Sequence, residues 1–212
     1  MDVVIKKTWE QIIHVHMTTK YFGIKAEEYA KDFKTYVQPF NELKNSLEHI
    51  IRAMSVEVGI TDKGQEYVKN NLDKALGHGY RAVFDTADWL TITIRDRIIE
   101  TLRPFNPEVI SKAMPEYYSN IRPRIDAICN DIAGLRGRKD IENDNDFMIK
   151  EVNGYGKILD ELLDIDKKIR NSVSAIIEIS NAKRNEKVIS GLIGFLSALV
   201  LSTITYFFKL KG

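Results

Sequence analysis

The stretch Lys183–Gly212, KRNEKVISGLIGFLSALVLSTITYFFKLKG, decides the architecture of this chain. From Val188 to Phe208 it holds 21 residues without a charge, although 29% of all residues in the chain are charged. About 20 apolar residues in a helix cross the roughly 30 Å hydrocarbon core of a bilayer. A central helix of a soluble bundle rarely runs this long without a charge. We therefore expect residues 188–208 to form one C-terminal transmembrane helix, a tail anchor.

Basic residues flank this segment on both sides. Three precede it (Lys183, Arg184 and Lys187) and two follow it (Lys209 and Lys211), which weakly favours a cytosolic N-terminal side. The first residues, MDVVIKKTWEQIIHVHM, lack the features of a secretory signal. We expect a single-pass protein of the cytoplasmic membrane with its N-terminal domain in the cytosol.

Small residues recur at every fourth position of the segment. They are Ser190, Gly194, Ala198 and Ser202, with Gly191 beside them. This spacing places them along one stripe of a helix, where two membrane helices can approach closely. The stripe predicts self-association into a homo-oligomer; the alternative is a chance register, because small residues are common in membrane spans.

The rest of the chain is helical in pattern, so the predicted fold class is all-α. We expect a helical soluble domain over residues 1–139, a linker and amphipathic stalk helix over 140–187, and the membrane span over 188–208. Within the soluble domain the pattern predicts helices over residues 3–18, 26–37, 41–58, 65–76 and 80–102, and one that starts at Pro107.

Local signals set the expected boundaries of these helices. The second helix should stop before Pro39, and Asn41 is the expected cap of the third. Gly77 and Gly79 should end the fourth. The run LTITI at residues 90–94 alternates like a strand, but a single strand has no partner here, so a helix is expected.

An apolar face is expected to bury the third helix in the core. Its members are Leu43, Leu47, Ile50, Ile51 and Met54.

The stalk region begins after RKDIENDND, residues 138–146, a polar stretch that reads as a linker. NGYG at residues 153–156 is an expected kink or break. A short heptad pattern follows, and the helix that carries it either packs on its own domain or pairs with copies of itself. The apolar positions are Ile158, Leu162, Ile165, Ile169, Ile176 and Ile179.

No catalytic, metal or cofactor motif occurs, so no enzymatic activity and no cofactor is expected. The two-residue spacing of His14 and His16 puts them on different sides of a helix, unlike a zinc pair. Cys129 has no second cysteine to pair with. An enzyme with an unfamiliar helical site is the remaining alternative.

The formal net charge of +1 excludes a strongly basic or acidic protein, so charge matters only locally. One basic cluster stands out in a stretch that we expect to turn back on itself at Gly134 and Gly137. Such groups contact phosphates of anionic lipid at about 1 kcal/mol each; alternatively Asp126, Asp131 and Asp140 pair with them as ordinary surface charge. The predicted lipid-binding residues are Arg122, Arg124, Arg136, Arg138 and Lys139, together with Lys183, Arg184 and Lys187.

In outline the chain resembles two tail-anchored groups, but it lacks the long heptad helix of syntaxin-type SNAREs and the NWGR-like segment of Bcl-2 relatives. It is more similar to the tail-anchored membrane effectors of prokaryotic antiviral systems that are encoded beside short or inactive Argonautes. This resemblance lies in size, architecture and composition. It implies binding of anionic phospholipid and depolarisation of the infected cell, triggered by a protein partner that senses nucleic acid, such as an Argonaute complex. Direct contact with nucleic acid is not expected. The rival expectation is a non-toxic scaffold that tethers a cytosolic complex to the membrane.

Overall fold

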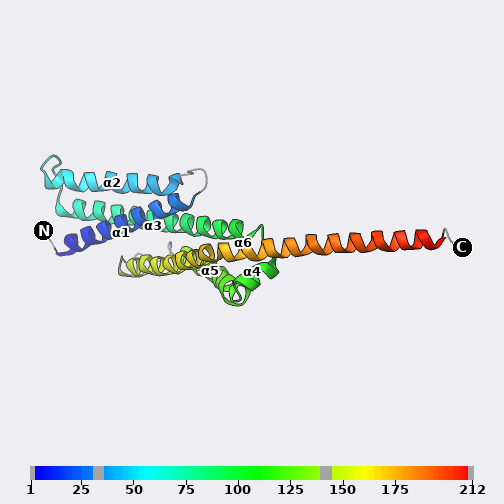
Figure 1. Cartoon of the computed structure of the whole chain (residues 1–212). Coiled ribbons are helices and arrows are strands. Elements are labelled where there is room, and N and C mark those ends of the chain that lie inside the picture. Colours follow the sequence, from blue (N-terminus) through cyan, green and yellow to red (C-terminus); the bar gives the residue numbers. More distant parts are fainter. Residues whose placement is uncertain (1–2, 31–35, 139–144, 210–212) are drawn as a thin grey trace.

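The computed structural model describes residues 3–30, 36–138 and 145–209, and within these ranges every regular element is a helix, as predicted. In chain order they are α1 (Val3–Tyr29), α2 (Val37–Glu57), α3 (Gln65–Leu102), α4 (Pro107–Ala113), the π-helix η2 (Tyr117–Ile121), α5 (Arg122–Arg138) and α6 (Asn145–Lys209). Helix α3 is central, with α1 and α2 on one side and α5 and α6 on the other (Figure 1). Helix α4 packs on α6, and α6 then continues alone to the C-terminal end of the molecule.

The hydrophobic core forms where α3 meets its neighbours. Leu72, Leu90 and Ile94 of α3 are completely buried, as are Tyr155 and Leu162 of α6. The first part of α6 therefore belongs to the same core as α3.

The LTITI run lies within α3, so the helix prediction is confirmed. Its threonines fit a helix because their hydroxyls bond to carbonyls four residues earlier. Thr91 Oγ1 donates to the Ala87 carbonyl at 2.8 Å, and Thr93 Oγ1 donates to the Trp89 carbonyl at 2.7 Å.

The predicted helix end at Gly77 and Gly79 is wrong, because α3 runs through both residues. Gly79 instead permits a close crossing of two helices. A Cβ atom there would lie 2.9 Å from Cγ1 of Val15 on α1, closer than such atoms normally approach. The glycine serves packing, and intrahelical hydrogen bonds carry the backbone past it.

The predicted helix over residues 26–37 is also wrong. Helix α1 continues to Tyr29, and α2 begins at Val37 with Pro39 in its first turn. Proline is tolerated there because the first backbone amides of a helix have no intrahelical acceptor. Asn41 is therefore not a cap; it lies inside α2, and Tyr36 occupies the N-cap position without a side-chain hydrogen bond.

Helix α2 does not bury the face that its apolar pattern predicts. Leu47, Ile51 and Met54 are 54%, 58% and 42% exposed, whereas Ser46 and Ala53 are buried. Small residues thus face α3, where the Ser46 hydroxyl donates to the Ala75 carbonyl at 2.9 Å. The prediction failed because close packing of helices favours small side chains over the most apolar ones.

Helix α4 begins at Pro107, as predicted. The Asn106 side chain caps it by accepting a hydrogen bond from the Glu108 amide at 2.9 Å. The predicted turn at Gly134 and Gly137 is wrong, because α5 runs from Arg122 to Arg138 through both glycines.

The predicted break at residues 153–156 is wrong as well, because α6 is continuous from Asn145. Tyr155 lies in this stretch with its side chain fully buried against Phe84, and the two ring centroids are 5.2 Å apart. This contact holds the glycine-containing turn in the helix.

The heptad positions of α6 pack on the chain's own helices. Leu162, Ile165, Ile169 and Ile176 are buried, and Ile158 and Ile179 pack partly buried against the same core. Of the two alternatives, packing on its own domain is the one observed. The linker residues 139–144 lie outside the described residues, so the domain boundary at residue 139 stays a prediction.

Candidate membrane-contacting surface

The C-terminal part of α6 has no protein neighbour. Among the described residues this helix is the one long and apolar enough to cross a membrane, and its most apolar window is not buried at all. Figure 1 shows it leaving the bundle as a single rod. Nine large apolar side chains between Val188 and Leu201 are about half exposed or more, from 48% at Leu199 to 66% at Leu201.

This exposure is costly in water. Burying a Val, Leu, Ile or Phe side chain contributes about 1.5–3 kcal/mol, so nine half-exposed ones leave about 7–13 kcal/mol unrealised. No face of the rod is polar, unlike the surface helix of a soluble protein. At 1.5 Å per residue, residues 188–208 span about 31 Å, the thickness of a hydrocarbon core.

The hydroxyl groups in this segment bond to the helix's own backbone. Ser197 Oγ donates to the Ile193 carbonyl at 2.8 Å, and Thr203 Oγ1 donates to the Leu199 carbonyl at 2.6 Å. A donor that is satisfied within the helix does not carry the several kcal/mol that an unpaired polar group costs in lipid. The serine and threonine content is therefore compatible with a membrane environment.

The predicted small-residue stripe is fully exposed along the rod. Ser190, Gly191, Gly194, Ala198 and Ser202 are all exposed, and a Cβ atom at Gly191 or Gly194 would meet nothing within 4 Å. The stripe is open for close approach by another helix.

The three basic residues before the segment differ in their surroundings. Lys183 is half-buried and bonds through Nζ to Glu108 Oε2 of α4. Arg184 and Lys187 are exposed. The hydrogen bond from Lys183 and its positive charge hold the pKa of the Glu108 carboxyl below its usual value, with smaller contributions from Lys187 and Lys112. Lys183 thus fixes the exit angle of α6, and the other two remain available to headgroups.

The basic residues of α5 lie in internal ion pairs more than was expected. Arg124 donates two hydrogen bonds of 2.6 Å to the Glu161 carboxylate on α6, and lies 3.4 Å from Asp131. The Asp131 contact is the surface pairing considered from the sequence. Arg122 is exposed.

Arg136 reaches α3 rather than solvent. Its Nη2 lies 2.6 Å from Oδ2 of Asp88, whose side chain is only 8% exposed. Arg138 ends α5, but its side chain lies outside the described residues, as do all atoms of Lys139. Because α5 is straight, Arg122 and Arg138 are 16 residues or about 24 Å apart along the helix. The structure therefore does not gather the predicted cluster into one pocket.

Distance along α6 separates the two basic groups. Glu161, the partner of Arg124, precedes Val188 by 27 residues, which corresponds to about 40 Å of helix. Lys183 precedes Val188 by five residues, or about 8 Å, which is the depth of a headgroup layer.

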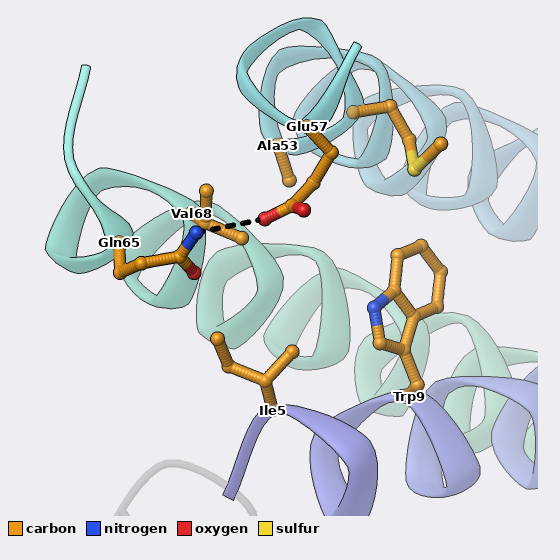
Figure 2. Close-up of a pocket in the computed structure, with 7 residues that line it drawn as sticks. Ile5, Trp9, Ala53, Glu57, Gln65 and Val68 are labelled. Atoms are coloured by element: carbon orange, nitrogen blue, oxygen red, sulfur yellow. Dashed lines mark hydrogen bonds between the residues drawn. The ribbon is translucent and has the colours of Figure 1, made fainter. Parts of the chain in front are cut away.

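Sequence reasoning missed an apolar groove between α1 and α2. Both helices pack on α3 and much less on each other, and two hollows of about 520 and 560 Å³ that share Trp9 lie between them. Figure 2 shows one of them, lined by Ile5 and Trp9 of α1 and closed at one side by the hydrogen bond from Gln65 to Glu57. The signal that was available is the spacing of small residues in α2, Ser46 and Ala53, seven positions apart.

No group of three His, Cys, Asp or Glu side chains that could hold a metal ion occurs in the part of the chain that the structure describes. Comparisons with models of protein families, with curated proteins and with solved structures found no match to this chain. No relative therefore lends it a function, and the resemblance to effectors encoded beside Argonautes stays a prediction.

Proposed function

We propose that this chain is a non-enzymatic effector that acts on the cytoplasmic membrane in antiviral defence. The apolar segment of α6, residues 188–208, spans the bilayer, and the helical bundle of α1–α5 and the first part of α6 lies in the cytosol. A protein partner that senses nucleic acid, such as an Argonaute complex, triggers it. The observation that carries the proposal is a helical rod about 31 Å long that is apolar on every face and contacts no other part of the described chain.

Self-association of the segments disrupts or depolarises the membrane. Close approach runs along the stripe of Ser190, Gly194, Ala198 and Ser202, with Gly191 beside it. The hydroxyl oxygens of Ser197 and Thr203 retain an acceptor lone pair, which offers water a polar contact when several segments cluster.

Anionic headgroups bind the basic residues nearest the segment. Lys183, Arg184 and Lys187 lie within about 8 Å of Val188 along the helix, inside one screening length of the surface at physiological salt. The arginines of α5 are about 40 Å away along α6, so they reach lipid only when the bundle lies down against the membrane.

The rival function is a non-toxic scaffold that tethers a cytosolic complex. A membrane-potential dye separates the two in cells that make the full chain or a chain ending at Lys187. The effector depolarises cells only as the full chain, whereas a tether leaves both cultures polarised.

A matched full-length control replaces Leu196 with Arg. A charge at the centre of a span costs about 2.5–3.5 kcal/mol against a gross gain of about 4–7 kcal/mol from twelve Val, Ile, Leu and Phe side chains. L196R should reduce both membrane recovery and depolarisation. Depolarisation by L196R protein that stays in the soluble fraction would exclude the spanning mechanism.

A further inference from the structure

The exposed face of α2 carries a heptad pattern that its own domain does not use. Phe40, Leu43, Leu47, Ile50 and Met54 follow steps of three, four, three and four residues, which is the a/d spacing of a coiled coil. Phe40, Leu47 and Met54 are 48%, 54% and 42% exposed. Leu43 and Ile50 are half-buried at the edge of the groove.

A second face of α2 does the packing within the domain. Pro39, Ser46 and Ala53, each one position before the first residue of a heptad, are the buried residues of this helix and face α3. The apolar stripe is thus additional to the inward face. It is long enough for two heptads, and α3 already holds α2 as a helix, so pairing along it does not have to pay for helix formation.

Helix α1 extends the same apolar surface across the groove. Ile13 and Met17 are 55% and 65% exposed, and both line the hollow of about 520 Å³ together with Leu43 and Leu47. The floor is Ala75, Leu76 and Gly79 of α3. A helix laid in this groove would contact α1 and α2 at once and complete a four-helix arrangement.

We propose that the occupant is α2 of a second copy of this chain, which runs parallel to the first α2. Each α2 then lies in the groove between α1 and α2 of the other copy, an isologous twofold contact. The stripe Phe40–Met54 forms the seam, and Ile13, Met17 and Ile51 border it.

The size of the patch fits a dimer. Ile13, Met17, Phe40, Leu47, Ile51 and Met54 are each about half exposed and together offer roughly 700 Å², close to the about 800 Å² per partner of a standard interface. Apolar patches of this size on a monomer mark interaction sites.

The parallel orientation rests on the proposed function. Helices α2 and α6 lie roughly along the same direction in the molecule (Figure 1). An antiparallel pair of α2 helices would point the two apolar segments in opposite directions, so both could not enter one bilayer from the same side. A parallel pair places both segments side by side.

The test is disulfide crosslinking of the full chain reconstituted in liposomes, with Cys129→Ser as background. Phe40→Cys and Leu47→Cys should each crosslink with themselves under mild oxidation, because parallel pairing brings equal positions together. Arg52→Cys lies on the exposed face opposite the seam and should not crosslink. An antiparallel contact, which joins Leu43→Cys to Met54→Cys but not Phe40→Cys to itself, would overturn the proposal.

Charge on the seam supplies the second arm. Leu47→Lys together with Met54→Lys should lower the Phe40→Cys crosslink by about tenfold or more, as expected for central interface residues. Ile99→Lys, a matched change at a 55% exposed position of α3, should leave it unchanged. Circular dichroism of each variant reports folding. An unchanged crosslink in the folded double-lysine variant overturns the proposal.

The crosslink and the membrane potential are measured on the same samples of cells. Self-crosslinking without depolarisation supports this interface and counts against the proposed function. Depolarisation without self-crosslinking has the reverse meaning.

Discussion

Arg136 Nη2 lies 2.6 Å from Asp88 Oδ2 and joins α5 to α3 over 48 residues of sequence. The arginine was expected at a lipid surface, and it instead meets a carboxylate that is nearly buried. Tyr155 of α6 lies close by: its pKa is raised by burial and by the negative charge of Asp88, and the positive charge of Arg136 offsets part of this effect. Three helices thus meet at one ion pair.

Removing the arginine should destabilise the bundle. Arg136→Met leaves the Asp88 carboxylate buried with one partner fewer, at a cost of about 1–3 kcal/mol in the free energy of unfolding. Arg122→Met, on the same helix but exposed, should change it by less than about 0.5 kcal/mol. Denaturant unfolding of the full chain in detergent micelles measures both. Equal stability of the two variants would mean that the ion pair does not hold α5 in place.

Two glycines of α3 should respond to alanine with opposite signs. Gly79→Ala places a Cβ atom 2.9 Å from Val15 Cγ1, so overpacking should destabilise by about 1–3 kcal/mol. Gly77→Ala meets nothing closer than Arg81 Nη1 at 4.0 Å, and should stabilise by about 0.5–1 kcal/mol through helix propensity. Thermal unfolding followed by circular dichroism gives the order of the two variants around the wild type. The reverse order would contradict the close crossing of α1 and α3.

Stability should depend on pH through Glu42. Burial raises the pKa of its carboxyl, but hydrogen bonds from His78 at 2.7 Å and Arg81 at 3.0 Å outweigh burial, so the pKa lies below its ordinary value of 4.5. A group whose pKa is lower in the folded state stabilises above its unfolded pKa and loses this contribution as pH falls through the folded pKa. The stability difference between wild type and Glu42→Gln should therefore shrink from about pH 6 to about pH 3. Glu48→Gln, at an exposed position of the same helix, is the control, and an unchanged Glu42→Gln difference over this range would contradict the assignment.

Bulk on the small-residue stripe should weaken association of the membrane segments. Gly194→Leu fills the position where a second helix would approach most closely. Thr203→Leu adds a bulky apolar side chain on the opposite face of the same helix and should have little effect. Crosslinking of the full chain in liposomes and membrane depolarisation in cells are the measurements. Full oligomer and full depolarisation with Gly194→Leu would show that the stripe is not the contact surface.

Lipid binding should depend on the basic residues next to the segment. Reversal of Arg184 and Lys187 to Glu should weaken recovery with vesicles that contain phosphatidylglycerol by about fivefold or more for each charge, and the effect should diminish at high salt. Recovery with phosphatidylcholine vesicles should change little. Reversal of the exposed Arg122 tests whether the bundle also touches the membrane. A loss confined to the Arg122 variant would move the lipid site from α6 to α5.

Local features of the sequence were enough for the all-α class, for the start of α4 at Pro107 and for the helical state of LTITI. The long uncharged run was likewise enough to mark the one described helix that qualifies as a span. Each depends on residues near in sequence: backbone hydrogen bonds within a helix, a proline at its first turn, or unbroken apolar composition. No partner elsewhere in the chain is needed to read them.

Only the tertiary structure decided how the helices use their faces. The apolar stripe of α2 predicted burial, yet Ser46 and Ala53 face α3 and Leu47 is left exposed, because close helix packing selects small side chains. Gly79 continues a helix rather than ending it, because Val15 lies against it. Arg124 and Arg136 found Glu161 and Asp88, carboxylates 37 and 48 residues away. Periodicity shows that a helix has an apolar side, but the neighbour that covers it and the partner of each charge depend on contacts distant in sequence.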